Sequence, residues 1–125
     1  MSSSTMPVPG TSTLTDSQLD LLRELLEQQR SFRCDQLDQL RRASLLPGRS
    51  PTEDEIAESL IAGARAALRD VLRALRRMDA GSYGFCEQCA EPLPIERLEV
   101  LPQVAQCMSC QRAAQGSSAA TAGSA

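Results

Sequence analysis

The sequence contains no histidine, no lysine and no tryptophan, so all 13 of its basic residues are arginines. Without histidine, the chain has neither imidazole acid–base catalysis nor an imidazole metal ligand. Its aromatic residues are two phenylalanines and one tyrosine, which excludes a large aromatic core. With 16 acidic residues the net charge is -3 and the pI is near 4.9. Wrapping around DNA or RNA requires a basic surface, so we expect no direct DNA binding.

Long apolar runs are also missing. No stretch approaches the roughly 20 apolar residues that would span a bilayer, and no basic segment followed by an apolar one marks a secretory signal. We therefore expect a cytoplasmic protein that does not associate with membranes. A length of 125 residues fits one small domain with tails. Five cysteines in such a chain indicate metal or redox chemistry rather than a disulfide framework.

The two ends of the chain have the composition of disordered segments. Residues 1–14 are mostly serine, threonine, proline and glycine, and residues 115–125 are mostly small and polar. Such segments bury too little apolar surface to offset the entropy of ordering. The sequence thus predicts a disordered tail at each end.

A first amphipathic helix is predicted from Thr15 to the turn at Pro47-Gly48. Thr15 and Gln18 have the spacing of a capping box. Proline and glycine end the helix because neither continues it comfortably. Between these points apolar residues recur at helical spacing, at Leu19, Leu22, Leu25, Leu26, Phe32, Leu37, Leu40 and Ala43.

A second helix is predicted from Pro51 to Ala80, with Ser50 as its cap and Gly81 as its stop. Its apolar positions alternate three and four residues apart, which is a heptad seam. These positions are Ala57, Leu60, Ala64, Ala67, Val71, Ala74 and Met78. A short connection forces the two helices to run antiparallel. Residues 15–80 are therefore predicted to form a coiled-coil hairpin.

Charged residues on the two helices favour the same pairing. The acidic row is Asp16, Asp20, Glu24 and Glu27, and the basic row is Arg65, Arg69, Arg73 and Arg77. In an antiparallel hairpin the two rows lie at neighbouring ends, where we expect solvated ion pairs that each contribute little. The alternative is an arginine stripe that contacts a partner.

Four of the cysteines have the spacing of a zinc site. Cys86 and Cys89 form one C-x2-C pair, Cys107 and Cys110 form a second, and 17 residues separate the pairs. Each pair places two thiolates on one tight turn, and two such turns complete a tetrahedron around zinc. Four protein ligands leave no open position, so we expect one structural Zn2+ per chain and no enzymatic activity.

The segment around these cysteines has little else to fold it. Its candidate core residues are Leu93, Ile95, Leu98, Val100 and Val104. About 35 residues with so small a core do not fold unaided, and zinc binding would supply the folding free energy, about 10 kcal/mol or more. The fifth cysteine, Cys34, is predicted to be a small hydrophobic residue beside the helical seam. A reactive thiol is the alternative for Cys34.

The motifs around the cysteines resemble a known family. From Asp79 the chain reads DAGSYGFCEQC, followed by IERLEVLP and then by CMSC. A helical hairpin followed by these motifs resembles the DksA/TraR family of bacterial transcription regulators. The resemblance covers residues 15–113 and is most specific over residues 82–112. Beyond the four cysteines, the residues that match the family pattern are Gly84, Ile95, Arg97, Leu98 and Pro102.

The resemblance implies an all-α fold, an antiparallel coiled-coil hairpin followed by a small four-cysteine zinc finger at residues 81–114. It also implies a zinc-binding, non-enzymatic regulator of transcription that binds RNA polymerase. In the family the hairpin enters the secondary channel of the polymerase, toward its active centre. The hairpin tip, near residues 46–58, would be the element that reaches it.

The tip differs from the family pattern. Active members carry Asp-x-x-Asp-x-Ala at this place, whereas this chain reads Thr52-Glu53-Asp54-Glu55-Ile56-Ala57. Ala57 is kept, and Thr52 and Glu55 replace the two aspartates. The candidate tip residues are therefore Asp54, Glu55 and Ala57. The plain alternative is that these carboxylates favour the helix N-terminus, by about 0.3–1 kcal/mol each.

A second difference concerns nucleotides. Family members that respond to guanosine tetraphosphate have basic residues before the conserved proline and just after the last cysteine. Leu101 and Gln111 occupy these positions here, so the sequence does not predict that response. Two further interpretations remain open. The protein could be a structural interaction module without channel activity, or a thiol-based redox sensor that releases zinc.

Overall fold

The structure, a computed structural model, describes residues 14–123. It contains helices α1 (Asp16–Ser44), α2 (Pro51–Ala80), α3 (Ile95–Val100) and α4 (Met108–Gly123). Between residues 14 and 123 the only β-pairing is an isolated antiparallel bridge between Phe85 and Pro92. Residues 1–13 of the predicted N-terminal tail lie outside the described residues. No described helix combines the length and apolarity that crossing a membrane requires.

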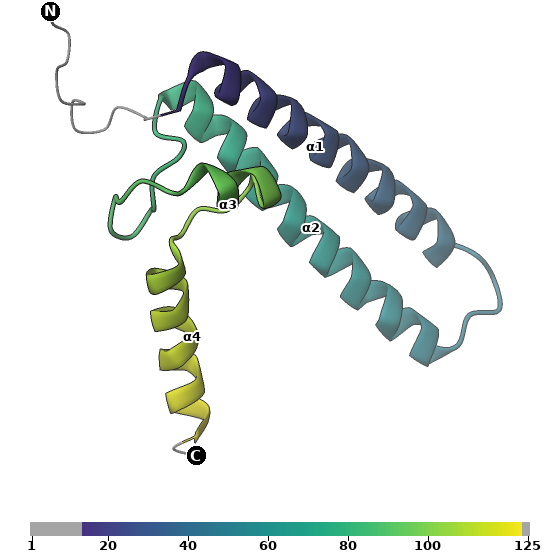
Figure 1. Ribbon diagram of the computed structural model, residues 1–125. Helices are drawn as coiled ribbons and strands as arrows, with labels where there is room; N and C mark the ends of the chain where they lie inside the picture. The colour runs from purple at the N-terminus through teal and green to yellow at the C-terminus, as the bar shows by residue number, and fades with distance from the viewer. Residues whose placement is uncertain (1–13, 124–125) are drawn as a thin grey trace, which may run out of the picture.

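Helices α1 and α2 form the predicted antiparallel hairpin (Figure 1). Its caps are those that the sequence indicates. The Thr15 hydroxyl accepts a hydrogen bond from the Gln18 N–H, and the Ser50 hydroxyl accepts one from the Glu53 N–H, each at 3.1 Å. Gly81 ends α2 in the left-handed region with φ 81°, a conformation that glycine adopts without steric cost.

The packed seam of α2 follows the predicted positions at Ala57, Ala64, Val71 and Ala74, which are all buried. Helix α1 buries Leu22, Leu26 and Leu37, and the alanine and valine positions of α2 accommodate them. Leu75 is buried beside Ala74, and the side chains of Ile61, Ala67, Leu68 and Met78 are partly buried. Leu60, predicted for the seam, is 51% exposed, and Phe32 of α1 is 60% exposed. Positions 61, 68 and 75 are covered together with positions 67 and 74, so the buried face of α2 is wider than the predicted heptad seam.

The finger and the base of the hairpin share one hydrophobic core. Leu93, Leu98 and Tyr83 are buried together with Leu22 of α1 and Val71 of α2. The Tyr83 hydroxyl donates to the Pro102 carbonyl at 2.8 Å, and burial raises the pKa of its phenol. The prediction that Val100 belongs to this core is wrong, since Val100 is 75% exposed. It lies at the end of the one-and-a-half-turn helix α3, on the side opposite the buried Leu98.

The predicted ion pairs between the acidic row of α1 and the basic row of α2 do not form. Within residues 14–123, the one ion pair that joins the two helices is Arg23–Asp79 at 2.9 Å, and its polarity is the reverse of the predicted one. Arg73 and Arg77 instead pair with Glu87 of the finger. Residues four apart follow one face of a helix, and the acidic row of α1 follows an exposed face.

The C-terminal segment also differs from the sequence prediction. A disordered tail is predicted from residue 115, whereas α4 continues to Gly123. Alanine is the strongest helix former, and residues 113–122 contain five alanines, which outweigh the serines and glycine among them. Helix α4 extends away from the base of the hairpin (Figure 1).

Candidate metal centre

The four cysteines of the two C-x2-C pairs come together in the structure. Their sulfur atoms all lie within 4.8 Å of one another, and the Sγ atoms of Cys89 and Cys107 are 3.7 Å apart. Four sulfurs at about 2.3 Å from a zinc ion, arranged as a tetrahedron, are separated by about 3.8 Å. The donor set and its spacing therefore fit a structural Zn2+.

The first cysteine pair sits on a tight turn after α2. The Ala90 N–H donates to the Cys86 carbonyl at 2.9 Å, and the Cys86 N–H donates to the Glu91 carbonyl at 2.8 Å. Ala90 adopts φ 64° to close this turn, which is the left-handed region that alanine rarely enters. The Phe85–Pro92 bridge holds the two sides of the turn together. This turn brings the thiols of Cys86 and Cys89 to one side.

The second pair stands at the start of α4. The Cys110 N–H points to the Cys107 sulfur at 3.4 Å, as the Gln88 N–H points to the Cys86 sulfur at 3.4 Å. A backbone bond from the Glu87 N–H to the Ala105 carbonyl, 2.8 Å long, joins the two pairs. Backbone donors aimed at sulfur favour the thiolate, which is the form that binds metal.

The cluster also has the electrostatics of a cation site. Burial raises the pKa of the Cys86 thiol, but the backbone N–H groups of Cys107, Cys89 and Gln88 outweigh it and lower that pKa to about 6. The Cys107 thiol, followed by that of Cys86, raises the pKa of Cys110 to about 12. Four adjacent sulfurs thus oppose complete ionisation by themselves. A bound Zn2+ supplies the positive charge under which all four become thiolates.

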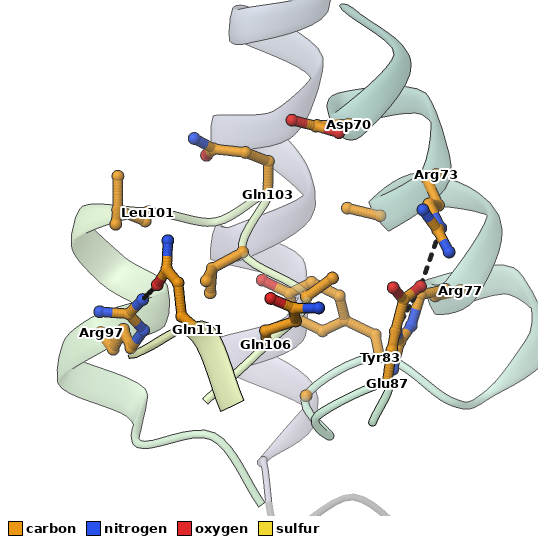
Figure 2. A pocket seen from close by; sticks show the side chains of 14 residues that line it. Asp70, Arg73, Arg77, Tyr83, Glu87, Arg97, Leu101, Gln103, Gln106 and Gln111 are labelled. Carbon is orange, nitrogen blue, oxygen red and sulfur yellow. Dashed lines mark hydrogen bonds and ion pairs between the residues drawn. The ribbon is translucent and has the colours of Figure 1, made fainter. Parts of the chain in front are cut away.

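An ion-paired carboxylate attaches the first cysteine turn to α2. Glu87, between Cys86 and Cys89, accepts from Arg73 Nε and Arg77 Nη1, each at 2.8 Å (Figure 2). Arg77 also donates through Nη2 to the carbonyls of Ser82 and Phe85, at 2.9 and 2.6 Å. The side chains of Glu87 and Arg77 are only 20% and 16% exposed. Charged hydrogen bonds with so little solvent around them are stronger than surface pairs.

We expect Glu87→Gln to loosen this attachment without removing zinc. The variant retains four thiols, so its metal content should equal that of the wild type. It loses the charge that pairs with both arginines, which should destabilise the protein by about 1–2 kcal/mol and lower the melting temperature by several degrees. Glu91→Gln is the control, because that exposed side chain has no ion-pair partner within the described part of the chain. Equal melting temperatures for the two variants would contradict a role for Glu87 in attachment.

A cavity of about 320 Å³ lies beside this attachment, between α2 and the finger (Figure 2). Leu101 and Gln111, the positions that differ from nucleotide-responsive members, both line it. Gln111 accepts a hydrogen bond from Arg97 Nη2 at 2.7 Å. Arg97 Nε and the Gln103 side-chain oxygen are buried with no hydrogen-bond partner in residues 14–123. The structure thus brings Leu101 and Gln111 to one wall, where they contribute an apolar group and a neutral amide.

The three candidate tip residues lie at the opposite end of the hairpin and have different surroundings. Ala57 is buried in the seam, and Glu55 is exposed. The Asp54 carboxylate accepts from Arg49 Nε at 2.9 Å. Arg49 also donates to the carbonyls of Ala43 and Glu53, at 3.2 and 3.0 Å. Arg49 therefore fixes the loop, and Asp54 takes part in that structure.

Sequence reasoning singled out neither Arg49 nor Glu87. Arg49 is the one charged residue between Ser44 and Ser50, which was an available signal. Glu87 had no such signal, because its partners lie 10 and 14 residues earlier on another element. The prediction for Cys34 beside the seam is wrong, since Cys34 is exposed on α1 and takes no part in the sulfur cluster.

Comparisons with known proteins agree with this geometry. Residues 81–116 match the model of the prokaryotic dksA/traR C4-type zinc finger. An uncharacterised protein of Aquifex aeolicus is 33% identical over 63 residues, which are 50% of this chain and 43% of that protein. The chain thus spans less than half the length of that relative. The RNA polymerase-binding transcription factor DksA of Escherichia coli is 26% identical over 117 residues, covering 86% of this chain and 78% of that protein.

A solved structure shows the same fold. It is that of the transcription factor DksA2 from Pseudomonas aeruginosa, which superposes with a TM-score of 0.71 at 21% identity and covers 82% of this chain and 87% of that one. The shared fold includes both the hairpin and the finger, because so large a share of each chain is aligned. The finger thus matches the dksA/traR C4-type zinc-finger model, and the hairpin that carries it shares the fold of DksA2.

Proposed function

We propose that this protein is a non-enzymatic regulator of bacterial transcription that binds RNA polymerase, with its hairpin reaching into the secondary channel. Cys86, Cys89, Cys107 and Cys110 hold the structural zinc ion, and the finger fixes the base of the hairpin. Support for the partner comes from the E. coli relative, whose name states polymerase binding and which aligns over 86% of this chain.

The observation that carries the proposal is the free length of the hairpin. Helices of 29 and 30 residues extend over about 45 Å at 1.5 Å per residue. The finger packs along the half that contains the base, up to Gln29 of α1 and Asp70 of α2, which leaves about 20 Å of hairpin beyond the finger. The opposite end exposes two adjacent leucines, Leu45 at 83% and Leu46 at 61%. A long rod with apolar side chains at its free end buries little surface for its own stability. It is suited to insertion into a partner.

Cleavage by hydroxyl radicals tests the position of the hairpin directly. Polymerase would be loaded with Fe2+ in place of its catalytic Mg2+ and mixed with the end-labelled protein. Radicals formed at the active centre cut nearby polypeptide, so we expect cuts within residues 45–58 and none within α4. Binding without cuts at the tip would contradict channel insertion, and absence of binding would contradict the choice of partner.

A second candidate function is an interaction module that binds polymerase without channel activity. One observation favours it, namely that the Asp54 carboxylate is ion-paired with Arg49, so a partner would have to compete with that pair. This candidate predicts normal polymerase binding with no change in transcription from any promoter tested in vitro.

A further inference from the structure

Three arginines in the second half of α2 have no partner in the described part of the chain. Arg73 and Arg77 of the predicted basic row form ion pairs with Glu87. Arg65, Arg69 and Arg76 are exposed, and none of them has an ion pair or a side-chain hydrogen bond within residues 14–123. We call these three residues the arginine ridge.

The ridge occupies one side of the helix. At 3.6 residues per turn, its three positions fall within about 40° of one another around α2 and extend over about 17 Å along it. The acidic row of α1, expected to neutralise arginines of α2, forms no ion pair with any of them. Three aligned guanidinium groups on a protein of net charge -3 are therefore left to solvent or to a binding partner.

We propose that the arginine ridge binds an acidic protein surface on RNA polymerase and so holds the side of the hairpin while its tip is inserted. This inference rests on the proposed function. Guanidinium groups pair with carboxylates through two parallel hydrogen bonds, and complementary charges at an interface raise the association rate and fix its orientation. The partner surface is thus expected to present carboxylates at a spacing that matches one side of a helix.

Charge favours a protein partner over nucleic acid. Glu58 lies seven residues before Arg65, on the same side of α2, and is exposed with no ion-pair partner in the described chain. A phosphate backbone that followed the ridge toward the tip would meet this carboxylate and the neighbouring Glu55. Three arginines are also few for a polyanion, whose affinity grows with the number of phosphates neutralised.

The test compares two double variants that each lose two positive charges. Arg65→Gln/Arg69→Gln removes two of the three arginines of the ridge. Arg42→Gln/Arg112→Gln is the control, because Arg42 has only a 3.7 Å exposed pair with Asp38 and Arg112 has no partner in residues 14–123. At about 0.1 M salt, the ridge variant should bind polymerase about tenfold more weakly and lose part of the salt dependence. The control should bind within about threefold of the wild type. Arg65→Lys/Arg69→Lys keeps the charge but not the paired hydrogen bonds, so its affinity should lie between those of the ridge variant and the wild type.

Each outcome decides between the explanations. If the ridge variant, the control and the wild type bind polymerase equally, the proposed role of the ridge is wrong and the proposed function is unaffected. Failure of the wild type to bind would overturn both. Sedimentation in low salt tests a second copy of this chain as the occupant, and binding to duplex DNA and single-stranded RNA tests nucleic acid. The proposal would also be wrong if the ridge variant lost self-association or nucleic-acid binding but bound polymerase as the wild type does. Metal content and circular dichroism confirm that each variant is folded.

Discussion

Replacing Cys107 with serine is expected to lower the zinc content from about one ion per chain to near zero and to unfold the finger. Three thiolates and a hydroxyl bind zinc far more weakly than four thiolates, because zinc in structural sites takes thiolate and imidazole ligands. Zinc binding supplies about 10 kcal/mol or more to the folding of such a finger. Without it, the segment keeps only a few buried side chains, chiefly Tyr83, Leu93 and Leu98.

The same variant should keep most of its helical circular dichroism but melt at a lower temperature. The helices retain the seam from Leu37 toward the tip, so the hairpin survives. Its base, however, shares one core with the finger, where Leu22 and Val71 are fully or almost fully buried. Unfolding of the finger exposes these side chains to water, at a cost of about 25 cal/mol per Å² of apolar surface. Atomic absorption, proteolysis of residues 81–107 and thermal melting measure the three effects.

Cys34→Ser is the matched control, since it makes the same chemical change at an exposed thiol outside the cluster. It should bind zinc and melt like the wild type. If the finger stays folded in Cys107→Ser, or if the wild type contains almost no metal, the folding of the finger does not depend on zinc. Zinc loss in Cys34→Ser would show that the ligand set is wrong.

The hairpin and the cysteine cluster could be predicted because local patterns encode them. Capping boxes at Thr15 and Ser50 mark helix starts within four residues of sequence. Two C-x2-C pairs restrict their thiols to tight turns whatever the remainder of the chain does. The α4 helix was missed because composition suggested disorder, although its alanines have the opposite tendency.

The width of the seam could not be settled from spacing alone. Positions 60, 67 and 74 and positions 61, 68 and 75 both complete a heptad pattern with Ala57, Ala64 and Val71. Both sets are covered in the structure, with Leu60 as the one exposed residue among the six. Ala74 and Leu75 are buried together in the core that the finger completes, and spacing within one helix does not report that contact.

Contacts between distant elements were the least predictable. Arg73 and Arg77 were assigned to the acidic row of α1, at the correct end of the hairpin, but Glu87 of the finger lies nearer. Helical periodicity gives the face of a charge and not its partner on another element. The arginine ridge depends on which arginines pair with Glu87 and which do not, and the sequence alone does not report that.

The Glu55→Gln variant is expected to abolish the effect on transcription without weakening binding to polymerase. Its carboxylate is exposed in the first turns of α2 at the free end of the hairpin, two residues before Ala57, as the second acid of the family motif precedes its alanine. Glutamine keeps the shape of the side chain and removes only the charge. The carboxylate is the group that could act near a catalytic Mg2+. In vitro transcription and a binding assay on the same preparation measure the two quantities.

Asp54→Asn should behave differently, because the Asp54 carboxylate is ion-paired with Arg49. Loss of this charge weakens the three-point attachment by which Arg49 joins α1, the loop and α2. We therefore expect slightly lower stability and a partial loss of regulation through a looser tip. Glu58→Gln, one turn further along α2, is the control and should regulate normally. A helix-dipole role alone predicts a stability loss under about 1 kcal/mol for Glu55→Gln with unchanged transcription, and that result would end the tip hypothesis.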